Sequence, residues 1–514
     1  MSQSTLAVTA AEEQATVSVT APASKSVSHR YLIGAALAQG VSTVRHTLES
    51  RDLERTRAIL CGAGASMETL PESTQASGAW RVTGMGGKPR GGTAQAPLSC
   101  DVEESGTTCR LLTAVLAAGE GEFRIHGAPR MHERPIGELT DALKNLGLTA
   151  TFEGKPDCPP LVLHAKGLNP ALCGGEVALG MDISSQYFSG LLLAAPMGPA
   201  PLSVVLSGQK AVSWPYVGLT LQCLTDYGIR FEVQTRAKAD DAWELLPPGA
   251  WRELKAAHPG CLRVTVHPGA YQAGDYTVEG DWSGASYLLA AGALGLRPVR
   301  VEGLRTDSLQ GDRAMLDILQ RMGARIRLTP DSVTVYPSAL HGVELDMGDC
   351  PDLVPTVAVL AAFAQGSTRV SNVAHLRYKE SDRISAPAQE LAKTGVVIDQ
   401  LSDGMLIHGL AGRGNGKPNC PLLPEGTALS AHNDHRIAMS LALLGLRQPD
   451  VSVRDLLDDP LVVRKSFPQF WNIWEQLACT ATKTGVAAPL PRAAGNPQRR
   501  MDLTVLPALA RVNP

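Results

Sequence analysis

The sequence has no large surplus of charge of either sign. Its 514 residues carry 47 Lys and Arg against 50 Asp and Glu, for a formal net charge of -3. Proteins that bind nucleic acid or a membrane surface usually carry a visible basic excess, so we expect neither partner. The basic residues are placed in small local groups, and such groups suit small anionic ligands.

Three further absences narrow the class of protein. The opening stretch has no basic segment followed by an apolar one, so we expect no secretory signal. No uninterrupted apolar run is long enough to span a membrane. The ten cysteines form no CxxC pair and no His/Cys cluster of ligand spacing, which predicts neither a disulfide framework nor a metal site. We therefore expect a cytoplasmic protein.

Six strongly apolar helical stretches are the main feature of the sequence. Each begins at a polar or Gly-rich junction, and they start at Ser28, Gly106, Ser184, Ser283, Asp352 and Asp434. A second pattern, a helical stretch ended by Gly and followed by an alternating strand, recurs at Gly147, Gly228, Gly323 and Gly395. Together they predict an α/β protein of repeated small units, each with two helices against a small sheet. The first helix of each unit is apolar on all sides, so we expect it to be buried between neighbours.

The first helix start, SKSVSHR from Ser24 to Arg30, suits an anion. The first amides of a helix lack partners and carry the positive end of its dipole. Ser24, Ser26 and Ser28 can cap these amides, while Lys25 and Arg30 add full charges. A Ser-capped helix with solvated basic residues is the simpler interpretation of this stretch taken alone.

The same design recurs at other junctions. Arg130 and Arg134 precede a helix that opens at Pro135, an arrangement that favours bidentate contact with phosphate or carboxylate. Further polar and charged residues cluster at helix starts and turns: Ser184, Ser185 and Gln186; His375, Arg377, Lys379, Glu380, Asp382 and Arg383; His432, Asp434, His435, Arg436, Arg464 and Lys465. Each cluster alone fits good caps or a solvated face. A cleft that gathers this many cations needs small anionic ligands.

Eight ordered motifs carry a resemblance to a known family. PASKSVSHR, SGTTCRLL, PRMHERPI, ISSQYFSGLLL, CPDLVPT, RYKESDRI, NDHRIAM and RKSFPQF resemble 5-enolpyruvylshikimate-3-phosphate synthase, which transfers the enolpyruvyl group of phosphoenolpyruvate to the 5-hydroxyl of shikimate 3-phosphate in the route to chorismate. The resemblance implies two domains, 1–22 with 280–476 and 23–279, each of three βαβαββ units, with the active site in the cleft between them. From about residue 477 to 514, low periodicity and many Pro and Ala predict a mobile tail.

Residue roles follow from the resemblance, motif by motif. It implies that Asp352 acts on the substrate hydroxyl, that Glu380 handles the proton at the methylene carbon, and that Lys25 assists. Shikimate 3-phosphate would be held by Lys25, Ser26, Arg30, Ser184, Ser185, Gln186, Ser213, Tyr216, Asp352, His375 and Lys379. Phosphoenolpyruvate would be held by Lys25, Gly106, Arg134, Gln186, Arg383, Arg436 and Lys465. Proton transfer and charge stabilisation by such groups need no cofactor. We expect a monomer, and the resemblance implies a family that is the target of glyphosate.

Three positions depart from the family pattern. Glu104 and His375 stand where Asn is common, and Ala23 replaces a usual Gly. An unpaired Glu104 would repel phosphoenolpyruvate, so we expect it to turn away or to pair with a cation.

Two alternatives stay open. The first is UDP-N-acetylglucosamine enolpyruvyltransferase, which usually has a reactive Cys in a moving loop, whereas Cys109 here lies inside a helical motif. The second is an inactive anion-binding relative. The simpler, non-catalytic interpretation is that Asp352 caps a helix and that Glu380 forms a surface ion pair.

Overall fold

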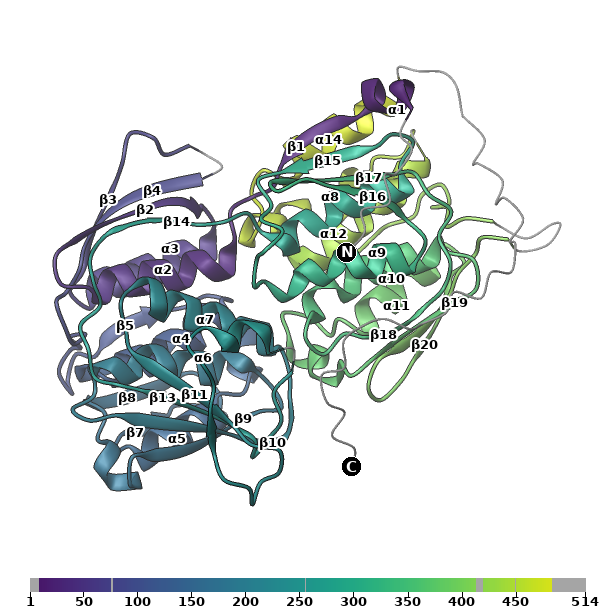
Figure 1. Cartoon of the computed structure of the whole chain (residues 1–514). Helices are drawn as coiled ribbons and strands as arrows, with labels where there is room; N and C mark the ends of the chain where they lie inside the picture. Colours follow the sequence, from purple (N-terminus) through teal and green to yellow (C-terminus); the bar gives the residue numbers. More distant parts are fainter. Residues whose placement is uncertain (1–8, 75–76, 255, 413–418, 449, 483–514) are drawn as a thin grey trace.

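Two lobes, each with its own hydrophobic core, make up the protein (Figure 1). The computed structural model describes residues 9–74, 77–254, 256–412, 419–448 and 450–482. One core runs from Ala23 to Val278, and we call this part the α2 lobe. The other combines Val19 and Ala21 with residues from Trp282 to Leu477, and we call it the α8 lobe. Within the described residues no helix is long and apolar enough to cross a membrane.

The α2 lobe holds three small sheets in the part of it that the structure describes. Its strands are β2 (Val41–Leu48), β3 (Ser66–Thr69), β4 (Ser77–Thr83), β5 (Leu98–Asp101), β6 (Glu120–His126), β7 (Thr149–Phe152), β8 (Leu161–Lys166), β9 (Glu176–Met181), β10 (Leu202–Ala211), β11 (Phe231–Thr235), β12 (Glu244–Leu245), β13 (Leu262–Val266) and β14 (Asp275–Thr277). Its helices are α2 (Lys25–Leu37), α3 (Arg51–Gly62), α4 (Gly106–Ala117), α5 (Gly137–Asn145), α6 (Ser185–Ala194) and α7 (Trp214–Asp226), with short 3-10 helices η1 (Pro129–Glu133), η2 (Pro170–Cys173), η3 (Ala195–Met197) and η4 (Ala250–Glu253).

The α8 lobe holds two sheets among its described residues. Its strands are β1 (Val17–Thr20), β15 (Val299–Glu302), β16 (Arg325–Leu328), β17 (Ser332–Tyr336), β18 (Glu344–Asp346), β19 (Ser367–Ser371), β20 (Val397–Gln400) and β21 (Met405–His408). Its helices are α1 (Ala10–Ala15), α8 (Trp282–Leu294), α9 (Met315–Arg321), α10 (Val354–Ala362), α11 (Ser385–Ala392), α12 (His435–Ala442), α13 (Val453–Leu456) and α14 (Phe470–Thr482), with η5 (Gly311–Ala314), η6 (Pro351–Leu353), η7 (Ala374–Tyr378), η8 (Leu443–Arg447) and η9 (Pro460–Lys465).

All five sheets share one strand order. In β5-β6-β8-β7, for example, the first two strands are parallel and the other pairs antiparallel. Along the chain, α4 lies between β5 and β6, and α5 lies between β6 and β7. The order recurs as β18-β19-β21-β20, β14-β2-β4-β3, β1-β15-β17-β16 and, with β12 added at the edge, β9-β10-β13-β11. This confirms the predicted α/β architecture of repeated units.

The sixth unit, around α12, departs from this plan. Within the described residues it has a single bridge, Leu429 to Leu457, in place of a four-stranded sheet. The preceding segment contains Pro421 and Pro424, which cannot donate the hydrogen bonds of a strand. The predicted tail also differs at its start, because α14 continues to Thr482. Residues 483–514 lie outside the described part of the chain.

The chain crosses between the lobes twice, at neighbouring places. Strand β1 pairs in parallel with β15 of the α8 lobe, although it leads into α2, and β14 pairs with β2 although it leads into α8. The crossings themselves pair at the Ala23–Gly280 bridge, and Asp281 donates its N–H to Pro22 O at 2.7 Å. Figure 1 shows β1, in purple, lying beside β15.

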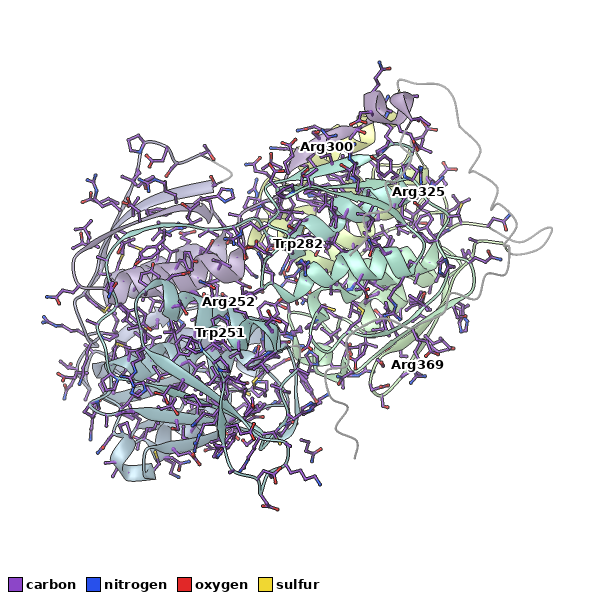
Figure 2. All side chains as sticks on the ribbon, in the orientation of Figure 1. Trp251, Arg252, Trp282, Arg300, Arg325 and Arg369 are labelled. Carbon is purple, nitrogen blue, oxygen red and sulfur yellow. The ribbon has the colours of Figure 1, made fainter. Side chains whose placement is uncertain are left out.

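Five of the six apolar helices begin at a side-chain cap. Ser24, Ser105, Ser184, Asp281 and Asp434 each accept an N–H of the first turn that follows. The helices behind these caps are almost wholly buried, as predicted. Trp282, the first residue of α8, is fully buried, and Figure 2 places it in the α8 lobe near the junction with the other lobe.

Candidate active site

One pocket brings most of the predicted site residues together from both lobes. The α2 lobe contributes Lys25, Ser26, Arg30, Thr107, Arg110, Arg134, Ser184, Ser185, Gln186, Ser213 and Tyr216, and the α8 lobe contributes Pro351, Asp352, Lys379, Glu380, Arg383, His435 and Arg436. Three predicted residues lie outside this lining: Gly106, His375 and Lys465. Four lining residues were not assigned to the site from the sequence: Thr107, Arg110, Pro351 and His435.

The start of α2 forms one wall of the pocket. Lys25 lies 3.2 Å from Asp52, which partly balances its charge. Arg30 is buried and donates to Thr220 Oγ1 and to Ser26 O, both at 2.8 Å. These bonds hold the guanidinium in the wall, and Lys25 and Ser26 lie beside it at the helix N-terminus, where an anion is favoured.

Arg110 adds a cation that the sequence analysis did not assign. It lies four residues after Gly106 on α4 and donates from Nη1 to Gln186 Oε1 at 3.1 Å. Gln186 in turn donates from Nε2 to Thr107 Oγ1 at 2.9 Å. The spacing of Gly106 and Arg110, about one helical turn, is the signal that places both on one face.

A network of carboxylates and arginines forms the opposite wall. Arg383 donates to Asp352 Oδ1 at 2.8 Å, to Glu380 Oε2 at 2.8 Å and to Asp434 Oδ2 at 2.7 Å. Arg436 donates to Asp352 Oδ2 at 2.7 Å. Burial favours the neutral form of Asp352, but Arg436 and Arg383 outweigh it and hold the pKa below its usual value. Burial likewise opposes ionisation of Glu380, and Arg383 and Arg134 lower its pKa despite it.

These contacts show that the simpler interpretations of Asp352 as a helix cap and of Glu380 as a surface ion pair are wrong. The N-cap of α10 is Leu353, with no side-chain cap bond, so Asp352 is not the cap. Glu380 does not form a surface ion pair, because its side chain is 16% exposed, its partner Arg383 is only 2% exposed, and Arg134 Nη1 approaches Glu380 Oε1 to 3.5 Å. Both carboxylates are ionised groups held inside a cationic pocket.

Two neighbouring groups are perturbed by burial. Burial lowers the pKa of Lys379 to about 8, against the opposing effect of Asp352. Burial and then Lys25 lower the pKa of His435 well below its usual value. Neither ring nitrogen of His435 has a hydrogen-bond partner among the described residues. The ring is therefore neutral, and both of its buried nitrogens are without a hydrogen bond in the described structure.

Glu104 pairs with a cation, as expected. Its carboxylate forms an ion pair with Lys465 and accepts from Asn433 Nδ2 at 2.7 Å. Lys465 also donates to Asn433 O at 2.8 Å. This contact joins the two lobes and explains why Lys465 does not line the pocket.

Gly106 and His375 are the other two predicted residues that do not line the pocket. A Cβ at Gly106 would come within 2.4 Å of Arg134 Nη2, so this glycine makes room for an arginine that does line the pocket. His375 is 4% exposed, and neither of its ring nitrogens has a hydrogen-bond partner in the described structure. Burial, followed by Lys379, lowers its pKa to about 3, so the ring is neutral.

Cys109 bears on the first alternative. Its side chain is buried in α4, and burial raises the pKa of the thiol to about 11. A thiol needs a lowered pKa and access to act as a nucleophile, so Cys109 is not a reactive cysteine.

Comparisons with known proteins identify the family to which the chain is similar. Residues 10–241 and 256–474 match the family model described as EPSP synthase (3-phosphoshikimate 1-carboxyvinyltransferase). Relatives named 3-phosphoshikimate 1-carboxyvinyltransferase include one from Thiobacillus denitrificans, 37% identical over 90% of this chain and 97% of its own, and one from Methanosphaerula palustris, 37% identical over 88% and 95%.

Solved structures share the fold at lower identity. EPSP synthase from Acinetobacter baumannii matches with a TM-score of 0.64 at 24% identity, over 91% of this chain and 95% of that one. The enolpyruvyl transferase NikO from Streptomyces tendae matches with a TM-score of 0.63 at 19% identity, over 90% and 94%. These two likenesses bear on the fold alone.

Proposed function

The chain belongs to the EPSP synthase family, and on that premise we propose that it transfers the 1-carboxyvinyl group of phosphoenolpyruvate to the 5-hydroxyl of shikimate 3-phosphate. Phosphate is released, and the product leads to chorismate and the aromatic amino acids. The observation that carries the proposal is a pocket in which cations from both lobes surround two ionised carboxylates, Asp352 and Glu380.

Shikimate 3-phosphate occupies the side of the pocket formed by α2, α6 and α7. Its phosphate meets the N-termini of α2 and α6, where Ser26, Ser184 and Ser185 can donate hydrogen bonds. Lys25 and Lys379 add charge from either lobe. The remaining members of the predicted set are Arg30, Gln186, Ser213, Tyr216, Asp352 and His375.

Phosphoenolpyruvate lies among the arginines between the lobes. Arg134 approaches from the α2 lobe, and Arg383 and Arg436 approach from the α8 lobe. Their planar guanidinium groups suit bidentate contact with carboxylate and phosphate. Lys25, Gln186, Gly106 and Lys465 complete the predicted set, and Lys465 must first leave Glu104. Arg110 lines the same region, so we add it to the set.

The carboxylates divide the proton chemistry. Asp352 accepts the proton of the 5-hydroxyl while the hydroxyl oxygen bonds to the ketal-forming carbon of phosphoenolpyruvate. Glu380 protonates the methylene carbon of phosphoenolpyruvate. Glu380 then takes back a proton as phosphate leaves, with Lys25 and the arginines stabilising the departing charge. Two bound anions offset the arginine charges that keep Glu380 ionised, so substrate binding raises the pKa of Glu380 and prepares it to donate.

A coupled phosphate-release assay tests the proposal against its alternatives. Purified full-length protein receives phosphoenolpyruvate with either shikimate 3-phosphate or UDP-N-acetylglucosamine. We expect phosphate release with shikimate 3-phosphate alone. Release with the nucleotide sugar would make the chain a UDP-N-acetylglucosamine enolpyruvyltransferase, and release with neither would leave an inactive anion-binding relative. Asp352→Asn, assayed in parallel, identifies any contaminating activity.

We further propose that the two lobes are the domains expected from the sequence, residues 1–22 with 280–476 and residues 23–279. They move as hinged bodies about the paired crossings at Ala23 and Gly280. The protein acts as a cytoplasmic monomer, needs no cofactor or metal ion, and binds glyphosate at the phosphoenolpyruvate site.

A further inference from the structure

A second aspartate lies behind Asp352 and has no role in the scheme above. Asp312, in η5, is 1% exposed, and its Oδ1 has no hydrogen-bond partner in the described residues. Its Oδ2 accepts a hydrogen bond from Ser283 Oγ of α8. A buried carboxyl group with one unpartnered oxygen is costly to the fold, which calls for a functional explanation.

Tyr216 connects Asp312 to the pocket. Its hydroxyl lies 3.4 Å from Asp312 Oδ2 and 3.3 Å from Asp352 Oδ2. A phenol has one proton, so it can donate to only one of these carboxylates at a time. Tyr216 belongs to α7 of the α2 lobe, whereas both aspartates belong to the α8 lobe. The connection therefore exists only while the lobes are together.

We propose that Tyr216 relays the proton of the substrate hydroxyl from Asp352 to Asp312, which is its terminal acceptor. The proposal rests on the proposed function. The substrate O–H bond breaks as an O–H bond forms on Asp352. The proton on Asp352 then passes to the Tyr216 oxygen as the phenolic proton passes to Asp312 Oδ2. Three O–H bonds break and three form, no electrons are transferred, and Tyr216 ends the step as a phenol.

The surrounding charges suit the two ends of this path. Burial, followed by the charge of Asp352, raises the pKa of Asp312 to about 7, while Arg436 and Ser283 oppose the rise. The pKa of Asp352 is held low by Arg436 and Arg383 against the effect of burial, so a proton on Asp352 moves downhill to Asp312. Asp281 and Cys350 also face Asp312, and the carboxylate of Asp281 adds to its raised pKa. Burial raises the pKa of Tyr216, so the phenol exchanges protons without resting as a phenolate.

The relay gives Asp312 a role that acts only through Tyr216. Asp312 touches no substrate, so it is a positioning residue for the phenol before transfer and the proton acceptor afterwards. Because Asp312 must be ionised to accept, activity falls as the pH drops through its pKa. Ser283 lowers that pKa by donating a hydrogen bond to the ionised form. Removing the Ser283–Asp312 hydrogen bond should therefore shift the pH dependence of activity without altering either substrate site.

The pH dependence of kcat/KM, followed by phosphate release, tests the relay in the full-length protein. This quantity reports ionisations of the free enzyme. We expect an acidic limb near pH 7 in the wild type. Asp312→Asn should lose that limb and should lower kcat by about tenfold to a hundredfold. Ser283→Ala should keep the limb and shift it to higher pH. Tyr216→Phe should resemble Asp312→Asn, because it cuts the same path.

Asp307→Asn is the matched control. Asp307 lies five positions before Asp312, is 73% exposed and pairs with Arg305, so its loss should leave kcat and the profile unchanged. Profiles of Asp312→Asn and wild type that superimpose would overturn the relay, as would an unshifted limb in Ser283→Ala. If Asp312→Asn does not fold, Ser283→Ala alone decides. A wild type that releases no phosphate refutes the proposed function itself, a result distinct from either of these.

Discussion

Gly106→Ala should weaken phosphoenolpyruvate binding by displacing Arg134. The added Cβ would lie 2.4 Å from Arg134 Nη2 and 2.7 Å from its central carbon, whereas ordinary van der Waals contact begins near 3.4 Å. The guanidinium must therefore retreat by about 1 Å. Arg134 Nη1 now donates to Glu104 O at 3.2 Å and lies 3.5 Å from Glu380. A shift of that size breaks the first contact or moves the charge away from the ligand.

The size of the effect follows from one charge-assisted hydrogen bond. Such a bond contributes about 1.5–3 kcal/mol, and each 1.4 kcal/mol is about tenfold in affinity. We expect the dissociation constant of phosphoenolpyruvate, titrated with shikimate 3-phosphate present, to rise by about ten- to a hundredfold. The affinity for shikimate 3-phosphate alone should stay near the wild-type value, because its predicted ligands do not contact Gly106.

Two further variants show whether Arg134 is the cause. Gly218→Ala is the matched control, since a Cβ at this position of α7 meets nothing within 4 Å. If the effect passes through Arg134, then adding Gly106→Ala to Arg134→Lys should cost far less than it does alone. Full additivity of the two changes would refute the reasoning. An equal loss of affinity for both substrates would show instead that α4 itself had been disrupted.

Four other changes have definite expected outcomes. Glu380→Gln should lower kcat by at least about a hundredfold and should suppress deuterium exchange into the methylene of phosphoenolpyruvate; exchange at the wild-type rate would exclude Glu380 as the proton donor. Burial lowers the pKa of Lys379 to about 8, so the affinity for shikimate 3-phosphate should fall as the pH rises from 7 to 9. Lys379→Arg should remove this pH dependence. A fall in affinity that persists in Lys379→Arg contradicts the assignment of Lys379 to this site. Glu104→Gln frees Lys465 and should tighten phosphoenolpyruvate binding by up to about fivefold, the scale of a part-exposed ion pair, with Glu103→Gln as control; weaker binding would mean that Glu104 orders Lys465 for the ligand. Saturating shikimate 3-phosphate should reduce the radius of gyration in solution scattering, and an unchanged radius would contradict hinged closure.

Local chemistry explains why much of the fold was predictable. Ser24, Ser184 and Asp434 indicate helix starts because their side chains cap backbone amides within one turn. The Gly that ends a helix, as at Gly147 and Gly228, has a positive φ that favours this residue. Both signals act over a few residues, so a single sequence reveals them. The pairing of Glu104 was also predictable, because an isolated carboxylate beside an anion site is unfavourable.

What the sequence left open depends on contacts between distant segments. Asp312 lies in η5, whose composition gives no sign of burial, and it becomes a site residue only because Tyr216 reaches it from the other lobe. His435 was counted among several basic residues, and only the folded chain shows its ring to be neutral and inside the pocket. The partner of Lys465 depends likewise on how the lobes meet.

Strand β1 belongs to the α8 lobe but precedes the α2 lobe in the chain, and β14 is the last strand of the α2 lobe. This arrangement constrains the order of events during synthesis. Residues 17–20 leave the ribosome before the α2 lobe, yet their partners Val299–Glu302 follow only after the whole α2 lobe has been made. Strand β1 must therefore wait, unpaired, while an insertion of more than two hundred residues emerges and can fold. The α2 lobe in turn lacks β14 until its own last residues appear. A ribosome-bound chain that ends before residue 299 should therefore carry an ordered α2 lobe and an exposed β1, which limited proteolysis can detect.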